Sequence, residues 1–269
     1  MKRRLLLGLA IATVVAACAT TTSPTGRTQR VGAVPQQQLN QMGAEAFAEY
    51  KAKLPQSNNP GQTAYVRCVV NTITRQLPAG SQAQWEVALF NNDSPNAFAL
   101  PGGKVGVYTG IFKVARNQDQ LAAVIAHEIG HVIAHHHDER VTRQTGAQAG
   151  LGIIGALVGS QYGSGAAQAT QQLGGAAVQA AFLLPNNRVQ ESEADVVGQR
   201  LMAQAGFDPR QAVDLWQNMI GASSGSRAPE WLSTHPDPQS RIAELRARAG
   251  GLLPTYEQAR AAGRTPDCD

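Results

Sequence analysis

The pentapeptide HEIGH, from His127 to His131, is the feature that most constrains the fold and chemistry of this chain. Two histidines four positions apart lie one turn from each other on a helix, so both side chains can reach one metal ion. Glu128 points into the same region, where it can accept a proton from an attacking water. This arrangement is typical of zinc peptidases. We therefore expect the motif to lie on a helix.

The residues around HEIGH have the period of an amphipathic helix. From Gln118 to His137, apolar positions recur at steps of three and four, which mark one face of a helix. Asp119 lies near the expected start, where acidic side chains interact favourably with the helix dipole. The alternative is a core helix whose histidines are satisfied by hydrogen bonds. A third ligand elsewhere in the chain favours the metal site.

A second helical stretch, RVQESEADVVGQRLM, supplies such a ligand. Glu191 and Asp195 are four positions apart and therefore on one face. Because catalytic zinc commonly has three protein ligands, we expect Glu191 to join His127 and His131. Asp195 is expected to accept a hydrogen bond from the distal ring nitrogen of a ligating histidine, which fixes the tautomer. Glu193 points elsewhere and is the weaker ligand candidate.

The N-terminus has the form of a secretory signal. Three basic residues, KRR, precede an apolar run from Leu5 to Ala17, which is too short to remain in a bilayer as a spanning helix. The run ends in VAAC, which resembles a bacterial lipobox. We therefore expect residues 1–17 to be removed and Cys18 to carry lipid, with Ala19 favouring the outer membrane. An ordinary signal peptide cut nearby, leaving a protein without lipid, is the alternative.

Removal of residues 1–17 also changes the charge balance. They contain three basic residues and no acid, so the formal net charge falls from +4 to +1. The remaining sequence has no basic patch of the kind that binds nucleic acid, and we expect no nucleic-acid partner.

The chain contains three cysteines. If Cys18 carries lipid, Cys68 and Cys268 remain as a pair, and an oxidising periplasm would let them form a disulfide. The bridge would tie the end of the chain to the early part of the domain. Two free thiols are the alternative interpretation.

Most of the chain is expected to form one catalytic domain over residues 39–250. Residues 18–38, rich in Thr, Gln, Pro and Gly, are expected to be a flexible tether, and residues 251–269 a short tail. The local patterns predict helices over Leu39–Lys53 and Thr63–Leu77 and strands over Trp85–Phe90, Ala97–Leu100 and Lys104–Tyr108.

Residues 144–187 contain no charged side chain and are rich in Gly, Ala and Gln. Their apolar core, Leu151–Val158, is shorter than a membrane span. One interpretation is a helical hairpin beside the active site. The other is a mobile flap that contacts membrane or unfolded substrate, which the glycine content favours.

HEIGH followed by ESEAD resembles the zinc metallopeptidase family of the heat-shock protease HtpX and the CAAX prenyl endopeptidases, peptidase family M48. Two further stretches agree: SPNAFALPGG at residues 94–103, and Thr234-His235-Pro236 with Arg241 as the closing motif. The resemblance covers residues 39–250, and the small periplasmic lipoprotein members are the nearest branch. It implies a zincin-like gluzincin fold of the α+β class, mainly α, with a small β-sheet beside the HEIGH helix.

The resemblance also implies roles for matching residues. His127, His131 and Glu191 would bind one Zn²⁺ per chain, and Glu128 would be the general base. The strand after Asn96 would pair with an extended substrate by β-augmentation. The implied substrate-binding residues are Asn96, Ala97, Phe98 and Ala99.

Two catalytic roles are open for His235. It would either donate a hydrogen bond to the oxyanion or bind the metal as a fourth ligand and silence the enzyme. A capping histidine in a turn beside Pro236 is the structural alternative. Arg241 belongs to the same motif without an assigned role.

The resemblance implies a zinc endopeptidase that cleaves misfolded or unassembled envelope proteins at the periplasmic face of the outer membrane. Its lipid would insert into the inner leaflet of that membrane. The alternative is a chaperone-like binding protein or assembly factor with latent proteolysis, which the charge-free segment and a His235 plug motivate.

Overall fold

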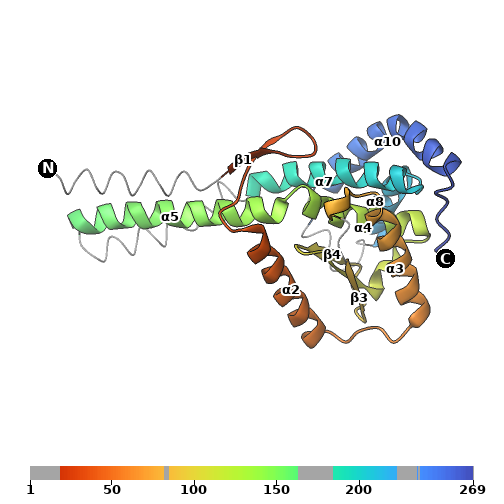
Figure 1. Ribbon diagram of the computed structural model, residues 1–269, viewed down its shortest axis with the longest axis horizontal. Helices are drawn as coiled ribbons and strands as arrows, with labels where there is room; N and C mark the ends of the chain where they lie inside the picture. The colour runs from red at the N-terminus through yellow and green to blue at the C-terminus, as the bar shows by residue number, and fades with distance from the viewer. Residues whose placement is uncertain (1–18, 82–84, 163–183, 223–234, 236, 269) are drawn as a thin grey trace. The chain divides into compact units, whose positions relative to one another are not determined.

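The computed structural model describes residues 19–268 apart from 82–84, 163–183, 223–234 and 236 (Figure 1). The predicted signal segment and Cys18 therefore lie outside the described residues. The chain divides into two compact units, one of residues 1–38 and 135–187 and the other of residues 39–134 and 188–269. Each unit is described by itself.

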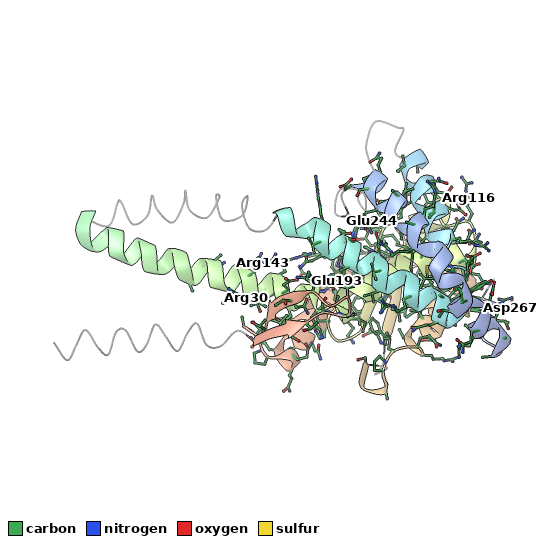
Figure 2. All side chains as sticks on the ribbon, turned by 90° about the horizontal axis from the view of Figure 1, so that it is seen from above. Arg30, Arg116, Arg143, Glu193, Glu244 and Asp267 are labelled. Atoms are coloured by element: carbon green, nitrogen blue, oxygen red, sulfur yellow. A yellow bond between two sulfur atoms is a disulfide. The ribbon has the colours of Figure 1, made fainter. Side chains whose placement is uncertain are left out.

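The first unit contains a β-hairpin and a long helix. Strand β1 (Ala19–Thr22) pairs antiparallel with β2 (Thr28–Val31), and α5 spans His136–Tyr162. Arg27, in the hairpin turn, donates two hydrogen bonds of 2.8 Å to the carboxylate of Glu139 on α5. Arg143, labelled in Figure 2, donates a third to the same carboxylate. These charge-assisted bonds fix the hairpin on the helix.

The flexible tether predicted over residues 18–38 is wrong for the part that the structure describes. Besides the hairpin, the following backbone is bound to α5: the N–H of Gly32 donates to Asp138 Oδ1 at 2.9 Å, and that of Ala33 to Thr142 Oγ1 at 3.1 Å. Side chains of a helix more than a hundred residues away therefore order this segment. Its own composition carries no sign of that partner.

The charge-free segment is helical at both ends, because α5 continues to Tyr162 and α7 begins at Leu184. The residues between them lie outside the described part. The choice between a hairpin and a flap thus stays a prediction. Within the described residues, no helix combines the length and the apolar character needed to cross a membrane.

The second unit contains a three-stranded sheet of order β3-β5-β4. Strand β3 (Glu86–Phe90) runs parallel to β5 (Lys104–Tyr108), and β4 (Ala97–Leu100) runs antiparallel to β5. The last two strands have the predicted bounds. Gly102 and Gly103 join them at φ 78° and 70°, values at which residues other than glycine are strained.

Helices surround this sheet and carry the site. Helix α4 (Gln118–Ile133) begins where Asn117 Oδ1 accepts the N–H of Gln120 at 2.8 Å, a standard N-cap. It ends before His135, whose φ of 55° separates it from α5. The other helices in the described part of the unit are α2 (Gln36–Lys53), α3 (Pro60–Thr74), α7 (Leu184–Ala205), α8 (Gln211–Ala222), α10 (Pro238–Ala261) and the short 3₁₀ helices η1 (Ala79–Ser81) and η2 (Thr109–Lys113).

Strand β4 packs next to α4, and the main core lies between the sheet and helices α3, α4 and α8. The alternation of β4 places Ala97 and Ala99 in this core. Phe98 faces the opposite side, in a second cluster under α2 that contains Phe47, Phe90 and Tyr108. The predicted class, α+β and mainly helical with a small sheet beside the HEIGH helix, is confirmed.

The boundary predicted at residue 250 is wrong, because α10 continues to Ala261 and the following residues pack on the domain. A disulfide joins Cys68 on α3 to Cys268, with Cα atoms 5.6 Å apart. The side-chain amide of Gln118 donates to the carbonyl of Pro266 at 2.9 Å and accepts the N–H of Cys268 at 3.0 Å. The C-terminal residues are therefore part of the folded unit.

Candidate metal centre

Helix α4 presents the two histidines of HEIGH to one point. His127 and His131 are both buried, and their Nε2 atoms lie 3.1 Å apart. Two neutral imidazole nitrogens at this distance face each other with lone pairs. Such an arrangement is stable when a proton or a cation lies between them.

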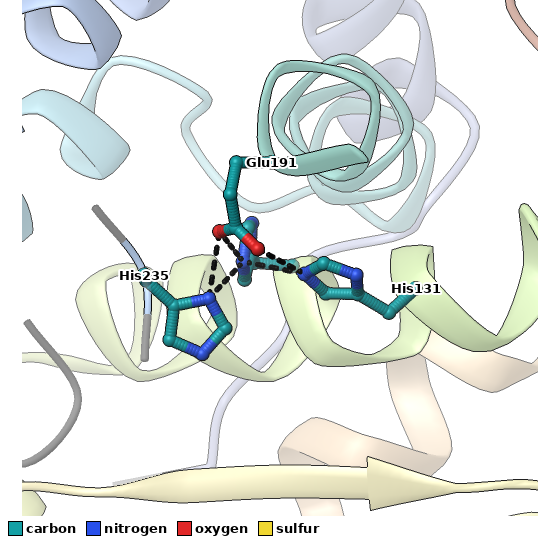
Figure 3. Close-up of side chains that lie close together, drawn as sticks. His131, Glu191 and His235 are labelled. Carbon is teal, nitrogen blue, oxygen red and sulfur yellow. Dashed lines mark hydrogen bonds and ion pairs between the residues drawn. The ribbon is translucent and has the colours of Figure 1, made fainter. Parts of the chain in front are cut away.

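Glu191, on α7, closes the site from the neighbouring helix. Its Oε2 lies 3.3 Å from His127 Nε2 and its Oε1 lies 3.3 Å from His131 Nε2. Figure 3 shows the carboxylate between the rings of His131 and His235. The side chain is about as buried as the histidines. The structure thus brings together the three expected ligands.

His235 lies in the loop before α10 and joins the same cluster. Its Nδ1 is 3.2 Å from His127 Nε2 and 2.7 Å from Glu191 Oε2 (Figure 3). One ligand atom from each of the residues His127, His131, Glu191 and His235 lies within 4.8 Å of all the others. His235 therefore has the position of a fourth ligand.

The spacing of these atoms fits a small metal ion. Ligand distances of 2.0–2.1 Å around tetrahedral zinc give ligand–ligand distances of about 3.3–3.4 Å. The distances from His127 Nε2 to the ligand atoms of His131, His235 and Glu191 are 3.1, 3.2 and 3.3 Å. Nitrogen and carboxylate ligands are also the set that zinc favours.

A second layer of residues orients His127. Its Nδ1 lies 3.0 Å from Asp195 Oδ1, which sets the tautomer whose Nε2 carries the lone pair that a metal would bind. Arg241 donates from Nε to Asp195 Oδ2 and from Nη2 to Asp195 Oδ1, both at 2.7 Å. Asp195 is thus placed where the sequence predicted, with a bidentate arginine behind it.

Arg241 is the residue whose role sequence reasoning missed. It also donates from Nη1 to Glu191 Oε2 at 2.9 Å, so one guanidinium contacts both Glu191 and Asp195 on α7. Its Cζ lies 4.1 Å from the ring centroid of Trp216, on α8, in a cation–π contact. The available signal was its position six residues after His235 in the closing motif.

The electrostatics of the site follow from these contacts. Burial and Arg241 lower the pKa of His127, but hydrogen bonds to Asp195 and Glu191 outweigh them and raise it to about 9. Burial raises the pKa of Asp195, and Arg241 more than offsets this, so that the carboxylate stays ionised. The pKa of Glu191 is lowered in the same way, by His131 and His235 against burial. The centre therefore combines two ionised carboxylates, Glu191 and Asp195, with a histidine, His127, that binds a proton readily when no metal is bound.

Glu128 is buried beside the ligands. Its Oε1 lies 3.4 Å from His235 Nε2, on the side of the ring opposite the nitrogen that faces the ligand cluster. The carboxylate therefore contacts the cluster through the ring of His235. Glu193, the weaker ligand candidate, is labelled on α7 in Figure 2 and is not one of the four clustered residues.

Strand β4 offers an unpaired edge beside α4. The N–H of Tyr108 donates to the carbonyl of Asn96, so the hydrogen-bonded pairs with β5 fall on Asn96, Phe98 and Leu100. The backbone groups of Ala97 and Ala99 then point to the other edge. Among the residues that the structure describes, no strand pairs with that edge.

Phe98, one of the predicted substrate-binding residues, turns its backbone groups away from the open edge of β4. Its backbone faces Gly106 of β5, and its ring covers that glycine, since a Cβ on Gly106 would lie 2.2 Å from Phe98 Cζ. Its ring also packs 4.5 Å from that of Tyr50, between centroids. Backbone groups alternate between the two edges of a strand. Since those of Ala97 and Ala99 point to the open edge, those of Phe98 must point to β5.

The comparisons with known proteins agree with this geometry. Residues 60–249 match the model of a family described as Peptidase family M48. The chain belongs to peptidase family M48. The resemblance inferred from HEIGH and ESEAD is thereby confirmed. The ligand helices α4 and α7 and all three strands of the sheet β3-β5-β4 lie inside the M48 match.

Two M48 relatives illustrate the similarity. Over 202 residues, 75% of this chain and 57% of the relative, the chain is 36% identical to the mitochondrial metalloendopeptidase OMA1 of Schizosaccharomyces pombe. Over 228 residues, 81% of this chain and 45% of the relative, it is 33% identical to the beta-barrel assembly-enhancing protease of Escherichia coli. The chain thus spans about half the length of these curated relatives.

Proposed function

We propose that this chain is a zinc-dependent endopeptidase. The observation that carries the proposal is the convergence of His127, His131 and Glu191 at tetrahedral spacing, with Glu128 buried beside them. Both relatives described above are named as proteases, one of them as a metalloendopeptidase. A structural zinc site would instead be closed by four Cys or His ligands.

The metal ligands and Glu128 have separate roles in the proposed hydrolysis. A zinc ion bound by His127, His131 and Glu191 would polarise the scissile carbonyl and lower the pKa of water. Glu128 accepts a proton from the attacking water and transfers it to the leaving amide nitrogen as the C–N bond breaks. The products are one new carboxyl end and one new amine end, so atoms and protons balance.

The substrate would bind as an added strand on β4. Backbone groups of Ala97 and Ala99 point to the open edge and can pair with an extended peptide. Asn96 precedes them at the end of the strand, where its side chain would hold the substrate backbone. Main-chain pairing carries little sequence preference, which suits cleavage of unfolded chains.

The substitution Glu128→Gln tests the activity. It should leave Zn²⁺ stoichiometry unchanged and abolish cleavage of an unfolded protein such as reduced casein, because the amide cannot accept the proton. The matched control is Glu257→Gln, an exposed acid on α10, which should cleave normally. Normal cleavage by the Glu128→Gln protein would exclude this mechanism.

The position of His235 supports a second candidate function, a binding protein with latent proteolysis. Its Nδ1 lies among the ligand atoms, where it would fill the coordination position that the attacking water needs. A chaperone or assembly factor would then require the residues of the β4 edge but not Glu128. Full complementation of a deletion strain by the Glu128→Gln variant would favour this function over the enzyme.

For the substrate and place of action, we propose misfolded or unassembled envelope proteins at the periplasmic face of the outer membrane. The support is the lipobox-like VAAC with Cys18 and the name of the Escherichia coli relative, which links it to β-barrel assembly. Metabolic labelling with an alkyne fatty acid should mark the wild-type chain and not the Cys18→Ser variant. Labelling of both would remove the lipid anchor from the proposal.

A further inference from the structure

Helices α4 and α7 contact each other through their backbones at two glycines. A Cβ on Gly130 would lie 2.8 Å from the carbonyl oxygen of Ala194, and a Cβ on Gly198 would lie 2.9 Å from the backbone nitrogen of His127. Real Cβ atoms essentially never come closer than 3.0 Å to another heavy atom. In both cases the added Cβ would meet backbone atoms, which cannot move away as the end of a flexible side chain can.

These contacts lie in the turns that carry the proposed metal ligands. Gly130 stands between His127 and His131, and it faces the residue directly before Asp195. Gly198 is one turn after Asp195 and faces the backbone of His127 itself. The close approach is therefore centred on His127 and Asp195, whose hydrogen bond orients a proposed metal ligand.

Asp195 depends on this approach because its side chain is short. Its Oδ1 lies 3.0 Å from His127 Nδ1. Ordinary van der Waals contact of a Cβ begins near 3.4 Å, and the added Cβ atoms would lie at 2.8 and 2.9 Å, so the helices would have to move apart by about 0.5 Å. That would stretch the bond to about 3.5 Å, beyond the usual hydrogen-bond range, and functional sites tolerate only about 0.5 Å of misplacement.

We propose that Gly130 and Gly198 are positioning residues of the metal centre. Their missing side chains let α7 approach α4 closely enough for Asp195 to orient His127 and for Glu191 to complete the ligand set. The inference rests on the zinc site proposed above. Glycine is less favourable than alanine in the interior of a helix. Its presence at both of these helical positions therefore indicates a steric requirement.

The chain contains a matched control. Gly250, in the exposed part of α10, is also a helical glycine, but a Cβ added there would meet nothing within 4 Å. Gly250→Ala changes the same residue type in the same kind of element. It separates the effect of helix propensity from the effect of the contact between α4 and α7.

The test compares the proteins with Gly198→Ala, Gly130→Ala and Gly250→Ala with the unaltered chain. Three properties are measured: thermal unfolding of the metal-free protein, Zn²⁺ affinity by competition with a chelating dye, and the visible spectrum of the Co²⁺ form. We expect the first two variants to unfold cooperatively, bind Zn²⁺ about 10–100-fold more weakly and show altered Co²⁺ bands. Gly250→Ala should match the unaltered chain in affinity and spectrum.

Each outcome decides a distinct question. Equal Zn²⁺ affinity in folded Gly198→Ala and Gly250→Ala proteins would overturn the positioning role. Failure of both site variants to fold, with Gly250→Ala folded, would assign the glycines to the fold as a whole and also overturn it. Absence of Zn²⁺ binding by the unaltered chain would instead contradict the proposed metal site.

Discussion

Arg241 holds the carboxylate of Asp195 by two hydrogen bonds of 2.7 Å, and Asp195 in turn holds His127 at 3.0 Å. The guanidinium thus acts on His127, a proposed zinc ligand, through Asp195, and it also donates to Glu191 Oε2 at 2.9 Å. Its fixed fork matches a carboxylate in a way that the single ammonium of lysine does not.

The first prediction concerns this arginine. Arg241→Lys keeps the charge and loses the bidentate contact, so Zn²⁺ affinity should fall about 10–100-fold with cleavage reduced in parallel. Arg246→Lys, an exposed position on the same helix, is the control and should have no effect. Isothermal titration calorimetry with Zn²⁺ checks the prediction, and equal affinities in the two variants would contradict it.

The second prediction concerns His235. Because its Nδ1 lies with the ligand atoms, His235→Ala should free a coordination position and raise kcat/KM on an unfolded substrate. Removal of an oxyanion donor would instead lower kcat by about 10²–10³-fold. Steady-state kinetics separate the two roles. His135→Asn, which alters an exposed histidine at φ 55°, is the control, since Asn tolerates that conformation.

The third prediction is the pH dependence of the metal-free protein. The pKa of His127 is about 9 in the folded chain and about 6.5 when unfolded. The protonated ring therefore stabilises the fold fully below pH 6.5, and this stabilisation is lost as the pH rises through 9. The free energy of unfolding should fall across that window, by at most about 1.4 kcal/mol per pH unit.

Urea denaturation in the presence of a chelator, between pH 6 and 10, measures this effect. His127→Gln should remove the slope within the window, because no proton is then bound at that position. An unfolding free energy that rises with pH over the same range in the unaltered protein would contradict the assignment.

The fourth prediction concerns the disulfide between Cys68 and Cys268, which closes a sequence separation of 200 residues. In the chain-entropy model, reduction should lower the free energy of unfolding by up to about 5 kcal/mol. Thermal unfolding with and without reductant measures the loss. The Cys68→Ser/Cys268→Ser double variant should be insensitive to reductant, and an equally stable reduced wild type would exclude the stabilising role.

Local signals in the sequence were sufficient for the elements that carry the site. The helical period around HEIGH, the spacing of Glu191 and Asp195, and the Pro-Gly-Gly turn before Lys104 are all determined by residues close in the chain. Strand and helix periods do not depend on distant partners. For this reason the bounds of β4 and β5 could be predicted to the residue.

The remaining features depend on contacts between distant segments. Residues 19–33 are held in an ordered conformation by contacts with acidic side chains on α5. Arg241 takes its role from its contacts with acidic side chains on α7. The orientation of Phe98 follows from its partner Gly106 and from α2. No local pattern encodes such a partner, so composition predicted a tether where the chain folds as a hairpin.

The side-chain amide of Gln118 donates a hydrogen bond to the carbonyl of Pro266 and accepts one from the N–H of Cys268. Gln118 is also the first residue of α4, the helix that carries His127 and His131. The last residues of the chain therefore hold the start of α4 in place, although the family match ends at residue 249. A protein shortened to the matched range would expose the start of α4 and the thiol of Cys68. Work with this chain should therefore keep its C-terminus intact.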